Sequence, residues 1–292
     1  MRFSFIDANK AEFPITVLCA VLDLSESGYH AWKTRPESAH SQKDRLLEVH
    51  IKAAFTESRG TYGSPRLTDE LDDKGISVGR HRIARLMREA GIQASKPKRF
   101  KATTDSKHLS PIAPNLIKRQ FDEVGAAPNK LWVTDITYIW TWQGWLYLCV
   151  FIDVFSRKVV GWSIDDTMET RMVLDALNMA VARRNPGTGL IGHSDRGSQY
   201  ASDSYRDRLE KCGITPSMSR KGDCWDNAIA ESFFASFKKD LIYRRSWGTK
   251  ASVEEAVKEW IEVFYNCDRR HSALGNVSPV NYEHLTREAL AA

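Results

Sequence analysis

Residues 190–200 read LIGHSDRGSQY and residues 222–240 read GDCWDNAIAESFFASFKKD. These two stretches predict the strand and the helix on which the rest of the fold is arranged. The apolar run at 190–192 predicts a short buried strand that leads directly into Asp195. Gly197 follows and permits a tight turn just after the carboxylate. The pattern therefore places Asp195 at the end of a buried strand.

The second stretch predicts a helix that carries another acid, Glu231. Asp226 and Asn227 suit a helix start. Steps of four, three and four residues give one helical face, which contains Asn227, Glu231, Phe234 and Lys238. An adjoining apolar stripe contains Phe233, Phe237 and Leu241. This stripe would hold the helix against a sheet and aim Glu231 along the edge of that sheet.

A third candidate acid is Asp135, which lies in the β-rich run LWVTDITYIW at 131–140. In an alternating strand it shares a face with apolar neighbours such as Leu131 and Val133. A carboxylate on such a face is costly unless it is paired or bound to a metal ion. Magnesium in phosphate chemistry takes hard oxygen ligands from several chain elements. The chain has 37 Asp and Glu residues, however, so spacing alone leaves a chance set of three acids open.

Four blocks of sequence resemble, in order and spacing, the signature blocks of OrfB-type bacterial insertion-sequence transposases with a retroviral-integrase-like (DDE) catalytic core. The blocks are WVTDITY at 132–138, HSDRGSQY at 193–200, DNAIAESFFASFK at 226–238 and YNCDRRHSALGNVSP at 265–279. The resemblance covers roughly residues 43–283, and the first forty residues match least distinctively.

The resemblance implies an α/β, RNase H-like mixed-sheet catalytic domain preceded by an α-helical helix-turn-helix domain. It implies that Asp135, Asp195 and Glu231 are the catalytic carboxylates and that Lys238 approaches donor-end DNA. The three acids would hold two Mg²⁺ ions, for which Mn²⁺ is a plausible substitute. The expected reaction is cleavage at the ends of an insertion sequence and transfer of the freed 3′-hydroxyl to a second phosphodiester of double-stranded DNA.

The same family often uses a frameshift fusion to a small upstream helix-turn-helix protein, so such a partner is expected here. Because two DNA ends are joined, a homo-oligomer of at least two copies is expected on the DNA. Two other readings stay open. One is a non-catalytic DNA-binding regulator. The other is a tyrosine-type recombinase, since His193 and Arg196 form an HxxR match.

The pattern from residue 129 onward agrees with a mixed α/β sheet. Strands are predicted at 131–139, 145–153 and 158–164, then a helix at 168–184, a strand at 190–194, a helix at 202–212 and a strand at 214–218. Asp153 ends the second strand near the same edge. It is interpreted as a structural acid or as one that supports the metal ligands, and a metal ligand is the alternative. His193 either packs or orients a ligand. Residues 253–266 predict one further amphipathic helix.

Residues 43–95 predict a helix-turn-helix DNA-binding domain. A helix is expected from about 42 to 57, and a second one begins with Ser64 as N-cap before Pro65. The third, at about 78–90, would turn a basic side outward, with Arg80, Arg82, Arg85 and Arg88 available to DNA. A helical hairpin with a solvated basic face is the alternative. Residues 1–42 form a helical extension.

Residues 96–128 predict a basic linker, in which Lys96, Lys98, Arg99 and Lys101 would follow backbone phosphates. A solvated tether is the alternative. The core is expected to span 129–283 and a tail 284–292. Residues 1–130 carry 22 Lys and Arg against 16 Asp and Glu, which is a net charge of +6. The whole chain carries +5, so the remaining residues carry a net charge of −1. This asymmetry is compatible with a polyanionic partner.

Composition sets limits on other classes of function. The five cysteines lack any CxxC pair, and a zinc site at Cys267 and His271 has no second ligand pair. The longest apolar run, WLYLCVFI at 145–152, is far shorter than a membrane span, and no signal peptide is evident. We therefore expect no membrane partner and a cytoplasmic, nucleoid-associated location.

Overall fold

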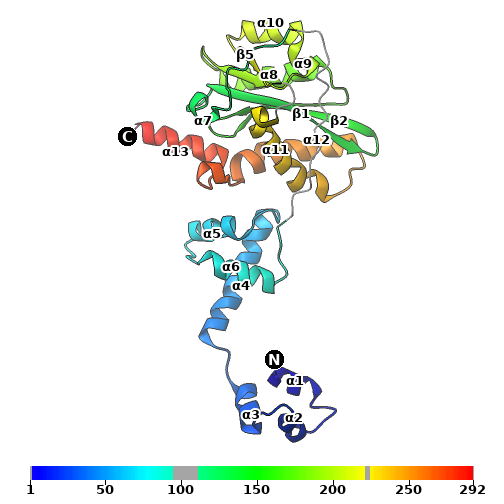
Figure 1. Cartoon of the computed structure of the whole chain (residues 1–292), viewed down its shortest axis with the longest axis vertical. Helices are drawn as coiled ribbons and strands as arrows, with labels where there is room; N and C mark the ends of the chain where they lie inside the picture. The colour runs from blue at the N-terminus through cyan, green and yellow to red at the C-terminus, as the bar shows by residue number, and fades with distance from the viewer. Residues whose placement is uncertain (1, 95–110, 221–223, 292) are drawn as a thin grey trace.

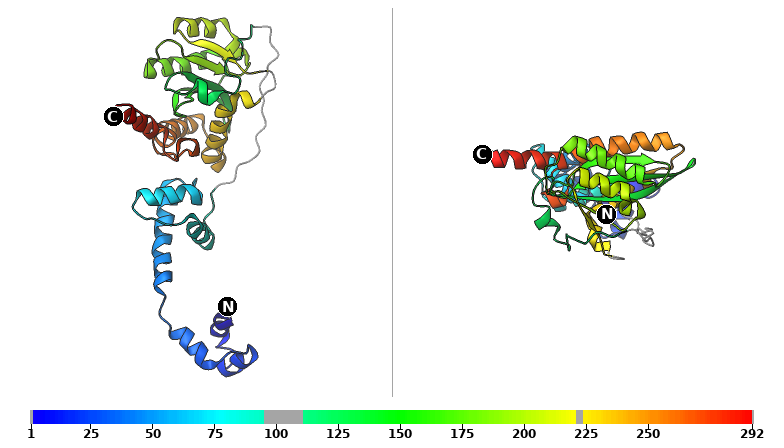
Figure 2. Two further views of the ribbon diagram at one scale, coloured as in Figure 1. Left: turned by 60° about the vertical axis from the view of Figure 1, so that its left-hand side comes forward. Right: turned by 90° about the horizontal axis from the view of Figure 1, so that it is seen from above.

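The computed structural model describes residues 2–94, 111–220 and 224–291. Its parts follow one another along the long axis of the molecule (Figures 1 and 2). Three short helices lie at the N-terminal end, a compact helical unit lies in the middle, and an α/β domain lies at the far end. The order agrees with the predicted succession of helical and mixed α/β parts.

The α/β domain is built on a five-stranded mixed sheet with the strand order β3-β2-β1-β4-β5. Its strands are β1 (Leu131–Thr141), β2 (Gly144–Asp153), β3 (Val159–Asp165), β4 (Ile191–Ser194) and β5 (Thr215–Met218). The first three are antiparallel hairpin neighbours, whereas β4 runs parallel to both β1 and β5. The predicted strands and their mixed sheet are confirmed.

Helices cover both faces of this sheet. One face packs against α8 (Thr170–Arg184), α9 (Ser198–Ala201) and α10 (Asp203–Lys211). The close approach of α8 depends on Gly161 in β3, because a Cβ atom there would lie 2.3 Å from the carbonyl oxygen of Ala176. The other face packs against α11 (Ala228–Asp240) and α12 (Lys250–Glu259).

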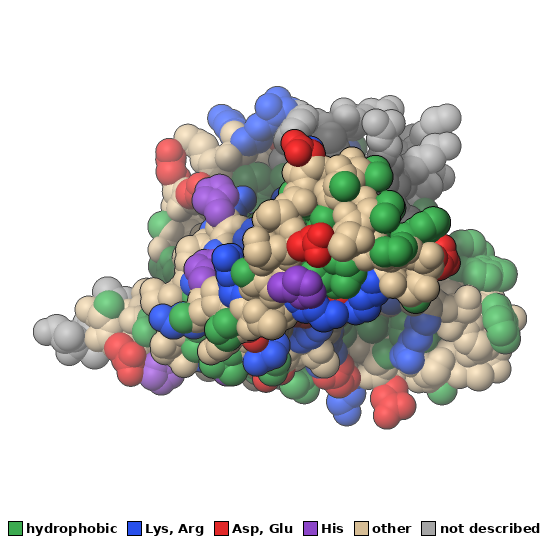
Figure 3. All heavy atoms as spheres, turned by 90° about the horizontal axis from the view of Figure 1, so that it is seen from below, with side chains coloured by type: hydrophobic (Ala, Val, Ile, Leu, Met, Phe, Trp, Pro, Cys, Tyr) green, Lys and Arg blue, Asp and Glu red, His purple; other side chains and the backbone are tan. Residues whose placement is uncertain are grey.

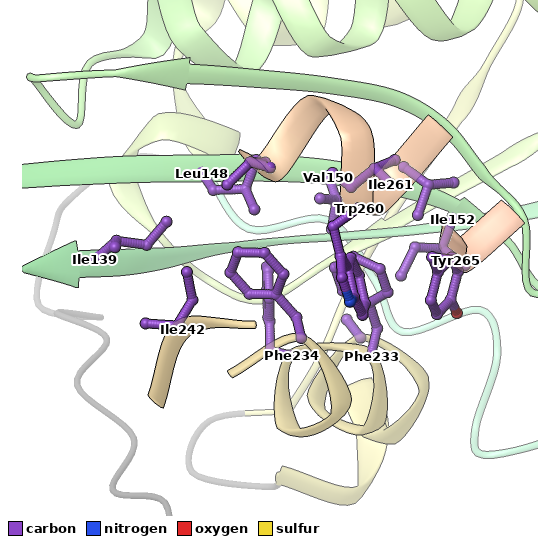
Figure 4. Close-up of a cluster of buried hydrophobic side chains, with 14 of the residues drawn as sticks. Ile139, Leu148, Val150, Ile152, Phe233, Phe234, Ile242, Trp260, Ile261 and Tyr265 are labelled. Carbon is purple, nitrogen blue, oxygen red and sulfur yellow. The ribbon is translucent and has the colours of Figure 1, made fainter. Parts of the chain in front are cut away.

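The core under α11 is rich in aromatic rings (Figure 4). Phe233 and Phe237 of α11 make edge contacts with the buried Trp260, with ring centroids 5.7 Å and 5.2 Å apart. The predicted apolar stripe is therefore confirmed, with Leu241 partly buried against the same core, and it fixes the helix that carries Glu231. The helix predicted at 253–266 is α12 followed by a π-helical stretch, Trp260–Asp268.

The C-terminal helix α13 (Pro279–Ala291) is tied to the sheet by a buried ion-pair network. The Arg184 guanidinium lies 2.9 Å from the carboxylates of both Asp153 and Glu283. Asp153 is thus a structural acid, as predicted. It pairs with Trp132 at the start of β1, so its predicted position near the edge that carries Asp135 is wrong. The strand is long enough to separate these two acids.

The N-terminal helices are α1 (Arg2–Asn9), α2 (Ile15–Val21) and α3 (Glu26–Thr34), which share a small core of their own. The next helix, α4 (Ala39–Glu57), begins before residue 42. The predicted domain boundary at 42/43 therefore falls inside a continuous helix, because polar residues such as His40 and Ser41 form its first turn. Ser38 accepts a hydrogen bond from the Ser41 amide and caps this helix.

Helices α5 (Ser64–Asp73) and α6 (Arg80–Glu89) pack on α4 around a common apolar core. Ser64 is the first residue of α5, and Gly63 takes the N-cap position without a side-chain hydrogen bond. The predicted Ser64 cap is therefore wrong by one residue. Ile83, Leu86 and Met87 form the buried side of α6.

This helical unit is bonded to the C-terminal part of the α/β domain. Arg270 Nε donates to Glu70 over 2.9 Å, and the Arg270 amide donates to the Tyr62 hydroxyl over 2.8 Å. Arg269 lies 3.0 Å from Asp240 in a buried pair. Both arginines of the basic 269–271 segment thus make ion pairs within the chain. The remaining short elements are α7 (Phe121–Val124), η1 (Cys224–Asn227), η2 (Ile242–Arg244) and η4 (Ser272–Leu274).

We expect His271 to make the protein less stable as the pH falls below about 6.5. Burial, and then the charges of Arg269 and Arg66, lower the pKa of His271 to about 3. Between these pH values the unfolded chain binds more protons, so the free energy of unfolding rises with pH, by at most about 1.4 kcal/mol per unit. Urea unfolding at a series of pH values measures this slope. His271→Gln should flatten it; an unchanged slope in that variant would contradict the assignment.

Within the described ranges, none of the helices is both long and apolar enough to cross a membrane.

Candidate active site

Asp135 and Asp195 are brought to the same level of the sheet by the pairing of β1 with β4. The two strands run parallel, with Val133 beside His193. Two residues further along each chain, this register leads to Asp135 and Asp195. Neighbouring strands lie about 4.8 Å apart, so the two carboxylates emerge close together. The sequence prediction that Asp195 follows directly on a buried strand is confirmed.

Local hydrogen bonds orient both carboxylates. Asp135 Oδ1 accepts a hydrogen bond from the Ile136 amide over 2.8 Å. Asp195 Oδ1 accepts one from the Gly197 amide over 2.9 Å. A Cβ atom at residue 197 would lie 3.1 Å from that same oxygen, so the glycine keeps the turn tight around the carboxylate. This is the turn that the sequence predicts.

The third acid comes from the first turn of α11. Glu231 is partly buried, and removal from water raises its pKa. Lys238, two turns further along the helix, is almost completely buried, with its ammonium nitrogen 4.6 Å from the centre of the Tyr138 ring. Burial lowers the pKa of Lys238 to about 8, and the charge of Asp135 partly offsets this.

The electrostatics of Asp135 show that these groups share one environment. Burial and then the charge of Asp195 raise the pKa of Asp135 well above its ordinary value, and the charge of Glu231 adds to this. The positive charge of Lys238 lowers the pKa of Asp135 and so partly offsets this rise. Negative charge is therefore concentrated in a partly dehydrated site, which is the condition that a bound cation would relieve.

The start of α11 is held in place by contacts that sequence reasoning did not foresee. The ring of His193 bonds Ser217 Oγ through Nδ1 and the Asp226 carbonyl oxygen through Nε2, both over 2.9 Å. His193 is fully buried, so it packs and positions η1. Asp226 in turn pairs with Arg220 over 3.1 Å. Arg196, the arginine of the HxxR match, also makes a contact within the fold, because its Nε donates to the carbonyl oxygen of Ser219.

The donor set fits a hard metal ion, although the side chains do not form a closed coordination shell. Across residues 2–94, 111–220 and 224–291, no three His, Cys, Asp or Glu side chains are grouped as a metal site. Near the acids, two buried side-chain oxygens, Thr137 Oγ1 and Asn227 Oδ1, have no hydrogen-bond partner among these residues. Oxygen donors alone, two of them without a hydrogen bond, suit Mg²⁺ or Mn²⁺ better than a softer ion.

Only part of the predicted basic face of α6 is open to solvent. Arg82 and Arg85 each lie 2.6 Å from Asp44 of α4, so both contribute to the packing of the helical unit. Their side chains are nevertheless 33% and 40% exposed, so the contact of Arg82 and Arg85 with DNA stays a prediction. Arg80 and Arg88 are exposed. The linker residues Lys96, Lys98, Arg99 and Lys101 lie outside the described residues.

Known proteins match this chain over nearly its whole length. Family models described as "HTH-like domain" and "Integrase core domain" match residues 41–100 and 125–224, and a second integrase core model matches 212–279. The insertion element IS600 uncharacterized 31 kDa protein of Shigella sonnei is 42% identical over 274 residues, which are 94% of this chain and 100% of that protein. Transposase InsF for insertion sequence IS3A of Escherichia coli (strain K12) is 39% identical over 286 residues, 97% of this chain and 99% of that protein.

The chain belongs to the insertion-sequence transposases with an integrase-type core. As a member of this family it is a DNA transposase, a polynucleotidyl transferase of the DDE class, and its helix-turn-helix and integrase domains bind DNA. Among solved structures, the catalytic core domain of BIV integrase is 18% identical to the transposase at a TM-score of 0.41, covering 56% of this chain and 98% of that one.

Proposed function

We propose that Asp135, Asp195 and Glu231 are the catalytic residues of this transposase and that they hold two Mg²⁺ ions, which Mn²⁺ can replace. The register of β1 with β4 carries the proposal, because it brings Asp135 level with Asp195. Burial and the charges of Asp195 and Glu231 also raise the pKa of Asp135, and such a carboxylate is costly unless a cation joins the acids. Bound metal would activate the attacking oxygen and stabilise the leaving oxygen of a phosphodiester.

The residues around the acids would supply positioning and charge. At neutral pH Lys238 is mostly protonated, since its pKa lies at about 8, and its ammonium group can hold a DNA phosphate beside Asp135. Water cleaves the element end and leaves a 3′-hydroxyl, which then attacks a phosphodiester of the target. One P–O bond breaks as another forms, so the joining step needs neither ATP nor a covalent enzyme intermediate.

Each part of the chain has its own proposed role. We propose that the helix-turn-helix unit at 43–95 and the linker at 96–128, with Lys96, Lys98, Arg99 and Lys101, bind the element end, and that residues 129–283 perform the chemistry ahead of a tail at 284–292. At least two copies would act together on DNA in the bacterial cytoplasm, with an upstream helix-turn-helix protein as partner or fusion. In Figure 3, Lys and Arg side chains on the lower face stand among Asp and Glu side chains, so DNA contact there would depend on individual cations.

The four arginines of α6 are expected to affect either DNA binding or stability. This is tested by replacing two of them at a time with Ala. Loss of the exposed Arg80 and Arg88 should weaken DNA binding about tenfold with the helical unit intact and reduce the salt dependence of binding. Loss of Arg82 and Arg85 should lower the thermal midpoint of the helical unit, because Asp44 then loses both of its arginine partners. Fluorescence anisotropy with duplex DNA and thermal melting distinguish the classes. Equal effects of the two pairs on both measurements would contradict this division.

The proposed chemistry is tested with the full chain, its upstream partner if one exists, and labelled element-end DNA. We expect nicking and joining with Mg²⁺ or Mn²⁺ and none in EDTA. Denaturing gels of the same reactions should show no DNA attached to protein. Activity in EDTA, or a trapped covalent adduct, would favour the recombinase reading. Specific binding with neither nicking nor joining in any metal would favour the regulator.

A further inference from the structure

Exposed aromatic side chains gather at the tip of the β1–β2 hairpin, where Trp142 lies seven residues beyond Asp135. The turn contains Trp142 and Gln143, and Gly144 follows with a φ of +104°, in the range that favours glycine. Trp140, Trp142 and Trp145 are 55%, 76% and 44% exposed. The sheet is already covered on both faces by helices, so these three indoles are not needed to complete its core.

These rings line a pocket of about 360 Å³ together with the segment that follows α11. The Trp142 amide donates to the Trp247 carbonyl oxygen over 3.0 Å, and Trp247 is itself 4% exposed. The Lys250 amide donates to Gln143 Oε1 over 2.9 Å. The hairpin tip is therefore bonded to the 247–250 segment, and the aromatic pocket is largely preformed.

The polar side chains of this pocket give it a positive charge. Its lining includes Lys238 and Arg245 and contains no Asp or Glu among the described residues. Arg245 stacks on Trp247, with its guanidinium carbon 4.0 Å from the ring centre, and Lys238 lies over Tyr138. Flat aromatic faces beside cations form the usual surface on which proteins hold unpaired nucleotides, with bases on the rings and phosphates on the cations.

We propose that this aromatic pocket binds an unpaired nucleotide of the DNA substrate, with its base stacked on Trp142 and its phosphate near Lys238 and Arg245. The inference rests on the proposed function, because Lys238 is the residue that links the pocket electrostatically to Asp135. Binding there would hold a frayed DNA end open, and stacking would stabilise a distorted end over a paired one.

The test compares two labelled DNA probes bound to the full chain in EDTA, so that cleavage plays no part. One probe is a blunt duplex, and the other is the same duplex with a short unpaired tail containing 2-aminopurine. Wild type should bind the tailed probe roughly tenfold more tightly and quench the 2-aminopurine fluorescence. Trp142→Ala should lose the preference and the quenching while keeping its affinity for the blunt duplex. Trp142→Phe should retain most of both, and Leu285→Ala, another exposed apolar position, should behave as wild type.

A preference and quenching that persist in Trp142→Ala would overturn the proposal. So would sedimentation showing that Trp142→Ala converts a dimer to a monomer with the preference unchanged, since the indole would then serve a contact between copies. Asp195→Asn separates this inference from the proposed chemistry. If that variant keeps the tail preference but loses cleavage, both stand; if it cleaves normally while Trp142→Ala loses the preference, only the catalytic assignment fails.

Discussion

Replacing Asp135 by Asn is expected to abolish DNA cleavage and joining while making the metal-free protein more stable. The native carboxylate is disfavoured by burial and by the charges of Asp195 and Glu231. A neutral amide of the same shape removes that repulsion, which should raise the free energy of unfolding by about 1 kcal/mol. It also removes a proposed metal ligand, so we expect joining to fall roughly 10³-fold or more.

The joining rate and the free energy of unfolding are both measured for wild type, Asp135→Asn and a control variant. Joining of labelled DNA in Mg²⁺ gives the rate, and urea unfolding in EDTA gives the stability. Asp203→Asn is the matched control, because that carboxylate lies on α10 and its side chain is 85% exposed, and it should change neither quantity. An Asp135→Asn protein that is inactive but clearly less stable than wild type would show that the carboxylate supports the fold.

Replacing Arg184 by Met is expected to be the most destabilising change in the α/β domain. The guanidinium is 9% exposed and lies between two buried acids, Asp153 and Glu283. Removing one partner of a buried ion pair typically costs about 3–5 kcal/mol, because the other charge stays buried without compensation. Thermal unfolding should show a large fall in the midpoint, and α13 should become sensitive to proteolysis.

Arg183→Met provides the contrast at the adjacent position. Arg183 pairs with Glu262 over 2.8 Å, but its side chain is 41% exposed, and exposed pairs contribute at most about 1 kcal/mol. Similar thermal midpoints for the two variants would contradict the structural role given to Asp153. An Arg184→Met protein that unfolds normally but fails to cleave DNA would place this network in the catalytic machinery.

The central sheet and its acids were predictable because their signals are local. The β-rich run around Asp135 fixes β1, and the short apolar strand and glycine turn fix Asp195. Glu231 follows from the spacing of its helix face. The assignment of these three as catalytic residues came from the family resemblance, and it stays a prediction until variants are measured.

Contacts between distant segments could not be predicted in this way. Arg82 reaches Asp44 across 38 residues, and Arg270 reaches Glu70 across 200, and neither partner is marked by spacing or composition. The aromatic pocket joins residues 138–145 to residues 238–247, so neither stretch alone reveals it. The start of α4 was predicted three residues too late because its first turn, with His40 and Ser41, carries no apolar stripe.

The most direct test of the account is joining of a pre-cleaved, labelled element end to target DNA by wild type, Asp195→Asn and Asp203→Asn in Mg²⁺, with the upstream partner present if one exists. The account predicts that wild type and Asp203→Asn join the DNA at equal rates and that Asp195→Asn binds the end but does not join it. Joining by Asp195→Asn at the wild-type rate would contradict the account.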